Sequence, residues 1–273
     1  MGARNRGPEG GEGGARPRAL ITGASSGIGE AFARELAKRG HDLVLVARRR
    51  DRLERLAGEL SEGLGIAADV LAADLAKEAD IAAVEERLRA DEIDLLVNGA
   101  GFGIVGEFAD VSLERQLEEL DVDVRALMRL THAALSAMIP RRRGGIINVA
   151  STAAFQPIPN MATYAASKAF VLFLTEAVHE EAKKHGVAVT CLCPGPVKTE
   201  FQQVAGVDRG RVPRFVWTST DRVVESALSA LRSRRAVVVP GTFNVMGAFS
   251  TRLAPRFLAR RIAASWFRNT SGS

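Results

Sequence analysis

The sequence has few of the residues on which several classes of protein depend. Its 273 residues include only two cysteines, Cys191 and Cys193, which excludes a disulfide framework and a zinc site built from cysteines. No apolar run reaches about 18 residues, which argues against a transmembrane helix. The N-terminus lacks the hydrophobic stretch of a signal peptide, so we expect a cytoplasmic protein. The four histidines show no metal-ligand spacing, and no metal site is predicted.

Arginines outnumber acidic residues at the two ends of the chain, and this explains the net charge of +5. Residues 1–18 carry four arginines and two glutamates, and residues 242–273 carry five arginines and no acid. The body between these ends therefore has a net charge of −2. A slightly acidic body is a poor match for a phosphate backbone, so no nucleic-acid partner is predicted.

Short apolar runs alternate along the chain with longer amphipathic stretches. With 47% hydrophobic and 25% charged residues, the chain is typical of a folded protein. The alternation favours an α/β fold: a single Rossmann-type, doubly wound parallel sheet of about seven strands with helices on both faces. We predict this domain over residues 18–241, preceded by a disordered tail at 1–17 and followed by a C-terminal extension at 242–273.

Turn residues and apolar periodicity set the expected boundaries of these elements. The predicted strands are Ala19–Thr22, Asp42–Ala47, Ile66–Ala72, Leu95–Asn98, Gly145–Ala150, Val187–Cys193 and Ala236–Val239. The predicted helices are Gly27–Arg39, Asp51–Leu60, Lys77–Ala90, Ser112–Met138 with Pro140 just beyond, a long helix ending near Lys184, and Thr220–Ser233.

A glycine-rich turn joins the first strand to the first helix. Gly23 would permit the tight turn, Gly27 the close approach of backbone to a pyrophosphate, and Gly29 the close packing of helix and strand. The turn therefore predicts a dinucleotide site, and the alternative is an ordinary strand-to-helix turn. The predicted cofactor contacts of this segment are Thr22, Gly23, Ser25, Ser26, Gly27, Ile28 and Gly29.

The end of the second strand bears on the choice of cofactor. An acid at this position would bind the ribose 2′-hydroxyl of NAD, but the chain has Ala47 followed by three arginines. A guanidinium pairs well with a 2′-phosphate, so we predict NADP(H), with Arg48 as the contact. The alternative is an exposed basic turn.

The single tyrosine of the chain, Tyr164, stands four residues before Lys168 in a helical stretch, so both side chains lie on one face. A nearby ammonium group and an oxidised nicotinamide would lower the phenol pKa from about 10 and make it a better proton shuttle. Ser151 directly follows a predicted strand, at the edge of the sheet where α/β folds bind ligands. The alternatives are an ordinary interface tyrosine with a solvated lysine, and a serine that caps the next helix.

Together these motifs resemble the short-chain dehydrogenase/reductase family over about residues 18–241. The resemblance includes the glycine turn, the segment Asn98-Gly99-Ala100-Gly101, Ser151 thirteen residues before Tyr164, and the segment from Pro194 to Thr199. It implies that Tyr164 is the general acid/base, that Ser151 binds the substrate oxygen, and that Lys168 holds the nicotinamide ribose. It further implies cofactor contacts at Asp74, Leu75, Asn98, Ala100, Gly101, Tyr164, Lys168, Pro194, Val197 and Thr199, and a homodimer or homotetramer.

Two positions depart from the family pattern. Gly99 replaces the second Asn of the usual Asn-Asn-Ala-Gly segment, and Asp123 replaces the catalytic Asn of the helix after the fourth strand. That Asn helps to position a water linked to the lysine, partly through its main-chain carbonyl, which an Asp also supplies. The Asp loses the amide donor and can carry a charge near Lys168. We therefore expect an impaired or retuned proton relay.

Apolar residues surround the predicted catalytic positions in the sequence. If the family geometry holds, they line an apolar substrate pocket, and core packing is the alternative for each of them. The candidates are Phe155, Pro157, Ile158, Pro159 and Met161 before Tyr164, and Phe201, Val204, Phe215 and Trp217 after Thr199. The collective bias favours a hydrophobic carbonyl or alcohol as the substrate.

Arginines and apolar residues recur every four positions within residues 242–268, as in a basic amphipathic helix interrupted at Pro255. Such a helix would contact an anionic membrane surface peripherally, which suits a lipid-like substrate, or would pack against its own domain or a partner subunit.

The leading functional hypothesis is an NADP(H)-dependent oxidoreductase that interconverts a carbonyl and an alcohol on an apolar substrate. The alternatives are a catalytically weak nucleotide-binding or interaction protein with the same fold, owing to Asp123, and a membrane-peripheral scaffold.

Overall fold

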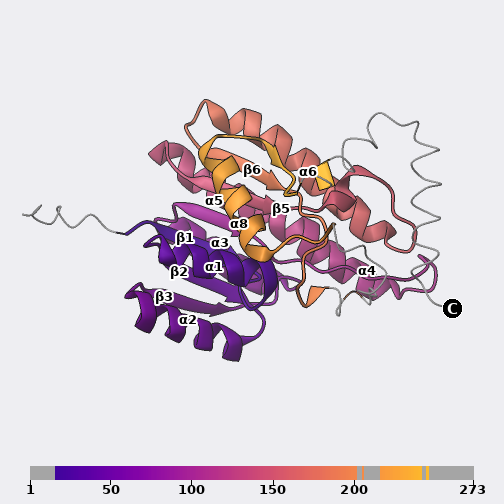
Figure 1. Cartoon of the computed structure of the whole chain (residues 1–273), viewed down its shortest axis with the longest axis horizontal. Helices are drawn as coiled ribbons and strands as arrows, with labels where there is room; N and C mark the ends of the chain where they lie inside the picture. The colour runs from indigo at the N-terminus through magenta and orange to yellow at the C-terminus, as the bar shows by residue number, and fades with distance from the viewer. Residues whose placement is uncertain (1–15, 202–204, 206–215, 242–243, 246–273) are drawn as a thin grey trace, which may run out of the picture.

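The computed structural model describes residues 16–201, 205, 216–241 and 244–245. Strands and helices alternate along these residues, as the apolar runs predict (Figure 1). The elements are β1 Arg18–Thr22, α1 Gly27–Lys38, β2 Asp42–Ala47, α2 Arg50–Leu64, β3 Ala68–Ala72, α3 Glu78–Ala90, β4 Leu95–Asn98, α4 Leu113–Leu120, the π-helix η1 Asp121–Ala126, α5 Leu127–Arg141, β5 Gly145–Val149, the 3-10 helix η2 Thr152–Phe155, α6 Ala162–Lys183, β6 Ala188–Leu192, α8 Thr220–Arg232 and β7 Val237–Val238.

Seven strands form one parallel sheet in the order β3-β2-β1-β4-β5-β6-β7. The predicted doubly wound α/β fold is thereby confirmed. The strand order reverses between β1 and β4, and the loops after these two strands diverge to opposite faces of the sheet. In open α/β sheets ligands bind at such a switch point, beyond the carboxyl ends of the strands.

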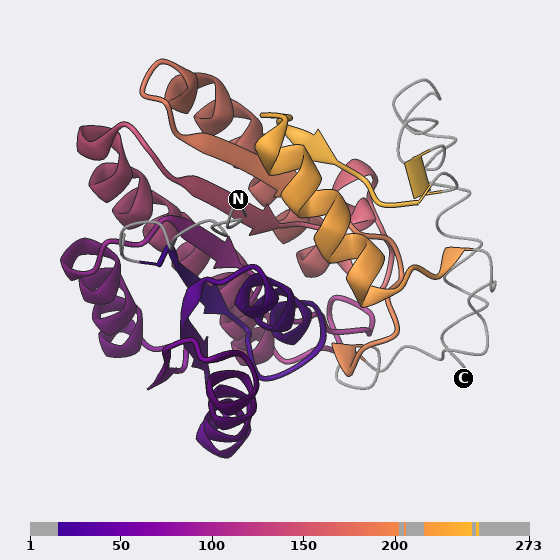
Figure 2. The same ribbon diagram turned by 60° about the vertical axis from the view of Figure 1, so that its left-hand side comes forward.

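Alternate strand residues pack into two separate cores because successive side chains point to opposite faces of a sheet. Ile21 packs with α1, α2 and α8 on one face, and the preceding residue, Leu20, packs with α3, α5 and the end of α6 on the other. Figure 2, turned by 60°, shows these helix layers on the two sides of the sheet. Burial on both faces explains why the strands read as continuous apolar runs.

The predicted helix Ser112–Met138 differs most from the structure. It is present as three consecutive pieces, in which α4 and α5 are joined by the six-residue π-helix η1. Pro140 lies inside α5 rather than beyond it, because a proline close to a helix end removes only one helical hydrogen bond. Most other predicted boundaries agree within two residues, whereas α2 extends four residues further, to Leu64.

The predicted tail at 1–17 lies outside the described residues except for 16 and 17, and the predicted extension at 242–273 does so except for 244 and 245. Its amphipathic character and the proposed domain boundaries therefore stay predictions. Within the part of the chain that the structure describes, no helix combines the length and the apolar character needed to cross a membrane.

Candidate active site

The glycine turn between β1 and α1 is closely packed against the segment that follows β4. The Thr22 hydroxyl accepts hydrogen bonds from the backbone N–H groups of Gly99 and Ala100, both at 3.1 Å. A Cβ at Gly29 would lie 2.3 Å from the carbonyl oxygen of Gly23, so only glycine fits there. The chain thus brings the N-terminus of α1 to the switch point of the sheet, where it can hold a phosphate group.

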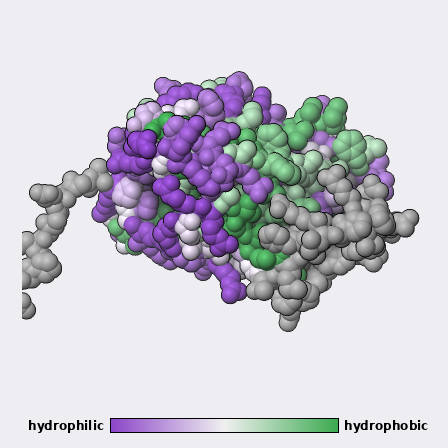
Figure 3. All heavy atoms as spheres, turned by 90° about the horizontal axis from the view of Figure 1, so that it is seen from above, coloured by the Kyte–Doolittle hydropathy of each residue, from purple (hydrophilic) through white to green (hydrophobic). Residues whose placement is uncertain are grey.

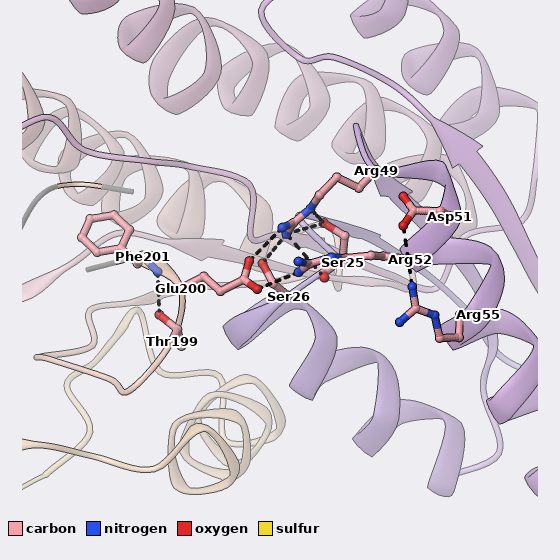
Figure 4. Close-up of polar contacts among 9 residues, drawn as sticks. All are labelled: Ser25, Ser26, Arg49, Asp51, Arg52, Arg55, Thr199, Glu200 and Phe201. Carbon is pink, nitrogen blue, oxygen red and sulfur yellow. Dashed lines mark hydrogen bonds and ion pairs between the residues drawn. The ribbon is translucent and has the colours of Figure 1, made fainter. Parts of the chain in front are cut away.

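Two neighbouring arginines follow β2 and point to different partners. Arg49 donates hydrogen bonds to the hydroxyl groups of Ser25 at 3.0 Å and Ser26 at 2.9 Å, in the glycine turn (Figure 4). The predicted 2′-phosphate contact, Arg48, is 61% exposed at its side chain and lies 3.6 Å from the carboxylate of Glu118. Arg49 is thus the arginine that the structure places on the turn, and the role of Arg48 stays a prediction.

Glu200 bridges two arginines next to the glycine turn. One carboxylate oxygen lies 2.8 Å from Arg49 and the other lies 2.7 Å from Arg52, the third residue of α2 (Figure 4). These two hydrogen bonds hold the pKa of Glu200 below its ordinary value, with Arg52 the larger cause. An arginine pair that holds a carboxylate in this way can also hold a phosphate.

Ser151, Tyr164 and Lys168 meet beyond the carboxyl end of β5. Ser151 follows β5 and caps η2 by accepting a hydrogen bond from the N–H of Ala153 at 3.1 Å. Tyr164 and Lys168 share one face near the start of α6, and the Lys168 ammonium lies 5.6 Å from the centre of the phenol ring. Lys168 also donates a hydrogen bond to the carbonyl oxygen of Val149, the last residue of β5, at 3.3 Å.

Ser151 therefore combines two roles that the sequence offered as alternatives. It caps η2, and its hydroxyl also hydrogen-bonds the phenol of Tyr164. Burial raises the pKa of Tyr164, while Lys168 and Ser151 act to lower it and Asp123 acts to raise it. Without a further positive charge, the phenol holds its proton more firmly than a tyrosine in water.

Asp123 lies in η1 and forms a buried ion pair with Lys168. Its Oδ2 is 3.0 Å from the Lys168 Nζ, and the two side chains are 0% and 5% exposed. Its other oxygen accepts a hydrogen bond from the N–H of Phe102 at 3.1 Å. Burial favours the neutral amine, but Asp123 first and then Tyr164 raise the pKa of Lys168 above its ordinary value. The lysine is therefore charged at neutral pH.

The predicted apolar residues divide between two regions. Phe201 packs on Tyr164 with ring centres 5.4 Å apart, and Ile158 and Met161 belong to the same cluster. Phe155 packs instead against a core cluster that contains Cys191 and Cys193. Val204 and Phe215 lie outside the described residues. The phenol thus contacts an apolar cluster that includes Phe201 but not Phe155.

The remaining predicted cofactor positions lie near the switch point in different roles. Asn98 is buried and donates hydrogen bonds to Thr131 and Asn148 at 3.1 and 2.9 Å, so its side chain joins β4 to β5 and α5. A Cβ at Gly101 would lie 2.7 Å from Asp123 and 3.0 Å from Lys168. The β carbon and γ methyl of Thr199 would lie 3.1 Å from a Cβ at Gly27.

Other predicted positions are engaged with the local backbone or the core. Asp74 accepts a hydrogen bond from the N–H of Ala76, and Leu75 is buried. Pro194 accepts a hydrogen bond from Thr152, and Val197 forms a parallel bridge with Thr218. Among the described residues, no group of three or more His, Cys, Asp or Glu side chains could hold a metal ion.

Sequence reasoning missed Glu119 and the cluster of Arg49, Arg52 and Glu200. Glu119 is 1% exposed, although it stands in a helix rich in acids. Its only signal is its position four residues before Asp123, on the same face of the helix. Glu200 and Arg49 lie 151 positions apart, and no local pattern joins them.

A parallel sheet with a glycine turn at its switch point and a Ser-Tyr-Lys cluster beside it defines a dinucleotide-binding oxidoreductase. The family model described as short chain dehydrogenase matches residues 17–209. The chain belongs to this family.

Solved structures with the same fold include a short-chain dehydrogenase from Sphingobium yanoikuyae in complex with NADPH, which is 38% identical with a TM-score of 0.81; the match covers 89% of this chain and 94% of that one. The bulky-bulky ketone specific alcohol dehydrogenase from Comamonas testosteroni is 35% identical with a TM-score of 0.75, over 82% and 86% of the two chains. A very-long-chain 3-oxoacyl-CoA reductase of Anas platyrhynchos is 34% identical over 195 residues, 68% of this chain but only 62% of the relative.

Proposed function

We propose that the protein is an NADP(H)-dependent oxidoreductase that interconverts a carbonyl and an alcohol on a bulky, apolar, lipid-like substrate. One observation carries this proposal: Ser151, Tyr164 and Lys168 converge at the carboxyl end of β5, beside the glycine turn. Open α/β sheets bind their ligands at this edge.

The residues at the switch point fit a dinucleotide with a 2′-phosphate. The glycine turn leaves no room for a side chain at Gly29, so the start of α1 packs closely on the end of β1, and Gly27 would let the backbone approach a pyrophosphate. Arg49 stands on this turn, and its present partner, Glu200, is itself an anion. Lys168 and Thr199 would hold the nicotinamide half of the cofactor, and Arg48 is a further candidate for the phosphate. The bound cofactor would supply or accept the hydride.

Tyr164 would exchange the proton with the substrate oxygen. In the reducing direction its phenol donates a proton to the oxygen of the former carbonyl, and the Ser151 hydroxyl donates a hydrogen bond to the same oxygen. Burial raises the pKa of the phenol, so the resulting phenolate needs a nearby positive charge. Lys168 provides that charge, and Asp123 keeps the lysine protonated and fixes its position.

The apolar cluster beside Tyr164 supports an apolar substrate. Phe201, Ile158 and Met161 present ring, methyl and thioether groups next to the phenol. The Comamonas relative is named for bulky-bulky ketones and the Anas relative for very-long-chain 3-oxoacyl-CoA, and both names describe a carbonyl within a large substrate.

The proposal is tested with a panel of diaryl ketones and long-chain 3-oxoacyl thioesters, each assayed with NADPH and with NADH. We expect turnover of at least one compound with NADPH. Tyr164→Phe, which removes one oxygen atom, should abolish turnover and still bind NADPH. Tighter binding of NADH than of NADPH would refute the cofactor assignment. NADPH binding without turnover across the panel would favour a nucleotide-binding or interaction protein.

Exposed apolar side chains on the neighbouring helices α4 and α6 support the predicted homodimer or homotetramer. Leu113 and Leu117 of α4 are 67% and 50% exposed, and Phe173 of α6 is 67% exposed. Figure 3 shows apolar residues gathered on the right-hand part of the face seen from above, with hydrophilic residues on the left. Such patches often mark protein contacts. Peripheral membrane contact through 242–268 stays a prediction, which liposome binding with and without these residues would test.

A further inference from the structure

Glu119 is a buried carboxyl group that the proposed reaction does not use. It lies near the end of α4 and is 1% exposed, and no side chain among the described residues hydrogen-bonds its carboxyl oxygens, which have only the backbone of Ile104 nearby. Glu114, on the same helix, is exposed to solvent. Buried polar groups in folded proteins are nearly always hydrogen-bonded, so a buried carboxyl without a side-chain partner calls for a physical explanation.

A small hollow adjoins Glu119, and none of Ser151, Tyr164 and Lys168 lines it. Its volume is about 10 Å³, which is close to the least that one water molecule needs. Gln116 and Thr163, which are hydrogen-bonded to each other, line the hollow together with Glu119. Phe108 also lines it and is 66% exposed, which places the hollow near the surface. A water in the hollow would connect Glu119 with solvent.

The other side of Glu119 leads to the catalytic lysine. Asp123 follows four residues later in η1, and its charge acts on Glu119. Its Oδ2 is 3.0 Å from the Nζ of Lys168, which shares a helix face with Tyr164. Titratable groups thus form a series from the hollow to the phenol, in the order Glu119, Asp123, Lys168 and Tyr164.

We propose that Glu119 holds a proton which it passes through Asp123 to Lys168, and that it takes up a replacement from water in the hollow. This inference rests on the proposed function. Glu119 is a positioning residue rather than a catalytic residue because it touches no reacting atom and its proton reaches the phenol only through Asp123 and Lys168.

The proton count balances in the reducing direction. After Tyr164 has protonated the product oxygen and Lys168 has returned a proton to the phenolate, the carboxylic acid of Glu119 gives its proton to the Asp123 carboxylate. Asp123 then passes a proton to the neutral lysine and is a carboxylate again. The Glu119 carboxylate takes up a proton from bulk solvent through the water in the hollow, which gives one proton and receives another, and no electrons are exchanged in these steps. In the oxidising direction each transfer runs in reverse.

The charges around Glu119 agree with this role. Burial first, and then the neighbouring Asp123, raise the pKa of Glu119 to about 8. Lys168 from α6, the backbone of Ile104, and Arg115 from its own helix act in the opposite direction without cancelling the rise. Glu119 is therefore protonated at neutral pH and gives up its proton just above it, as a proton store must.

Infrared spectroscopy of the protein without cofactor or substrate tests the proton store directly. We expect a C=O stretch of a neutral carboxyl group at pH 7 that disappears with a midpoint near pH 8. The band should be absent in Glu119→Gln and unchanged in the surface control Glu114→Gln, and in Asp123→Asn it should remain at acidic pH with a lower midpoint. No such band in wild type at pH 7, or a band that Asp123→Asn removes even at acidic pH, would overturn the proposal.

A second readout tests the connection to the phenol, since Tyr164 is the only tyrosine and its ultraviolet titration is unambiguous. A charged Glu119 raises the pKa of Tyr164, so Glu119→Gln should move the phenol midpoint to lower pH, whereas Glu114→Gln should not. An unchanged midpoint in Glu119→Gln would overturn the connection. Neither experiment requires turnover, so failure here is distinguishable from failure of the oxidoreductase proposal. Where turnover is found, Glu119→Gln should remove a pH dependence of kcat near 8 and leave the KM for NADPH unchanged.

Discussion

Two groups of charges lie near the carboxyl edge of the sheet, and they differ in burial rather than in distance. Asp123 and Lys168 are 3.0 Å apart, with side chains 0% and 5% exposed. Glu200 lies 2.8 Å from Arg49 and 2.7 Å from Arg52, but all three side chains are about 40% exposed. The same kind of contact therefore has different consequences in the two places.

The difference in burial suits the two groups to different tasks. A buried charge that loses its partner is left without solvation, so the Asp123–Lys168 pair stays fixed. A half-exposed pair is solvated and screened, so Glu200 can release Arg49 and Arg52 at a small energetic cost. Fixed charges suit a site that must hold a proton in one place. Exchangeable charges suit a site that must accept and release a phosphate.

Breaking the buried pair should have the largest effect. Lys168→Met leaves the Asp123 carboxylate without a compensating positive charge in the core, and we expect the free energy of unfolding to fall by about 3–5 kcal/mol. Lys183→Met, which removes an exposed lysine paired with Glu180 on the same helix, should leave stability unchanged. Urea denaturation of both variants measures the difference. Equal losses would show that burial does not separate the two kinds of pair.

The pH dependence of stability should show the buried carboxyl of Glu119. Because its pKa rises from 4.5 to about 8 on folding, the folded state binds the proton more firmly than the unfolded state. Its stabilising contribution is therefore complete below pH 4.5 and is lost as the pH rises toward 8. Over this window wild type should lose up to about 1.4 kcal/mol per pH unit relative to Glu119→Gln.

Denaturation curves for wild type, Glu119→Gln and the exposed control Glu114→Gln, recorded at intervals from pH 5 to pH 9, test this window. The control should follow wild type throughout. Parallel stability profiles for wild type and Glu119→Gln would mean that Glu119 titrates like a carboxyl group in water.

The fold was predictable from the sequence because burial on both faces of the sheet leaves a continuous apolar signature in each strand. The positions of Ser151, Tyr164 and Lys168 follow from the same pattern, since each stands at a fixed offset from a strand end or on one helix face. These features depend on local sequence and on the strand order that α/β folds share.

The rest depends on contacts that no local pattern encodes. Arg48 and Arg49 are consecutive residues between the end of β2 and the start of α2, and their backbone directions decide which one reaches the glycine turn. The burial of Glu119 depends on how α4 passes into the π-helix η1, where an extra residue per turn alters which side chains face inward. Glu200 meets its arginines only through the tertiary fold.

Replacing Arg48 and Arg49 by alanine one at a time should separate their roles at the exposed site. Arg49→Ala removes the guanidinium that contacts Ser25 and Ser26, and we expect NADPH to bind roughly 10- to 100-fold more weakly, as for the loss of one charged hydrogen bond. NADH binding should be unchanged because it has no 2′-phosphate. Calorimetric titration of Arg49→Ala and of Arg48→Ala measures both effects. A larger loss in Arg48→Ala would assign the phosphate to Arg48.

Removing Glu200, which competes with a phosphate for the two arginines, should give the smallest effect, an increase in the affinity for NADPH. Glu200→Gln takes away the carboxylate that Arg49 and Arg52 hold, so NADPH should bind about two- to fivefold more tightly. The gain should shrink as salt is added, because these charges are half-exposed. Glu54→Gln, which removes an exposed partner of Arg50 on α2, serves as the control and should leave affinity unchanged. If Glu200→Gln weakened NADPH binding, Glu200 would be orienting the arginines for the cofactor rather than competing with it. Glu200 would then hold its arginines in place, as Asp123 holds Lys168.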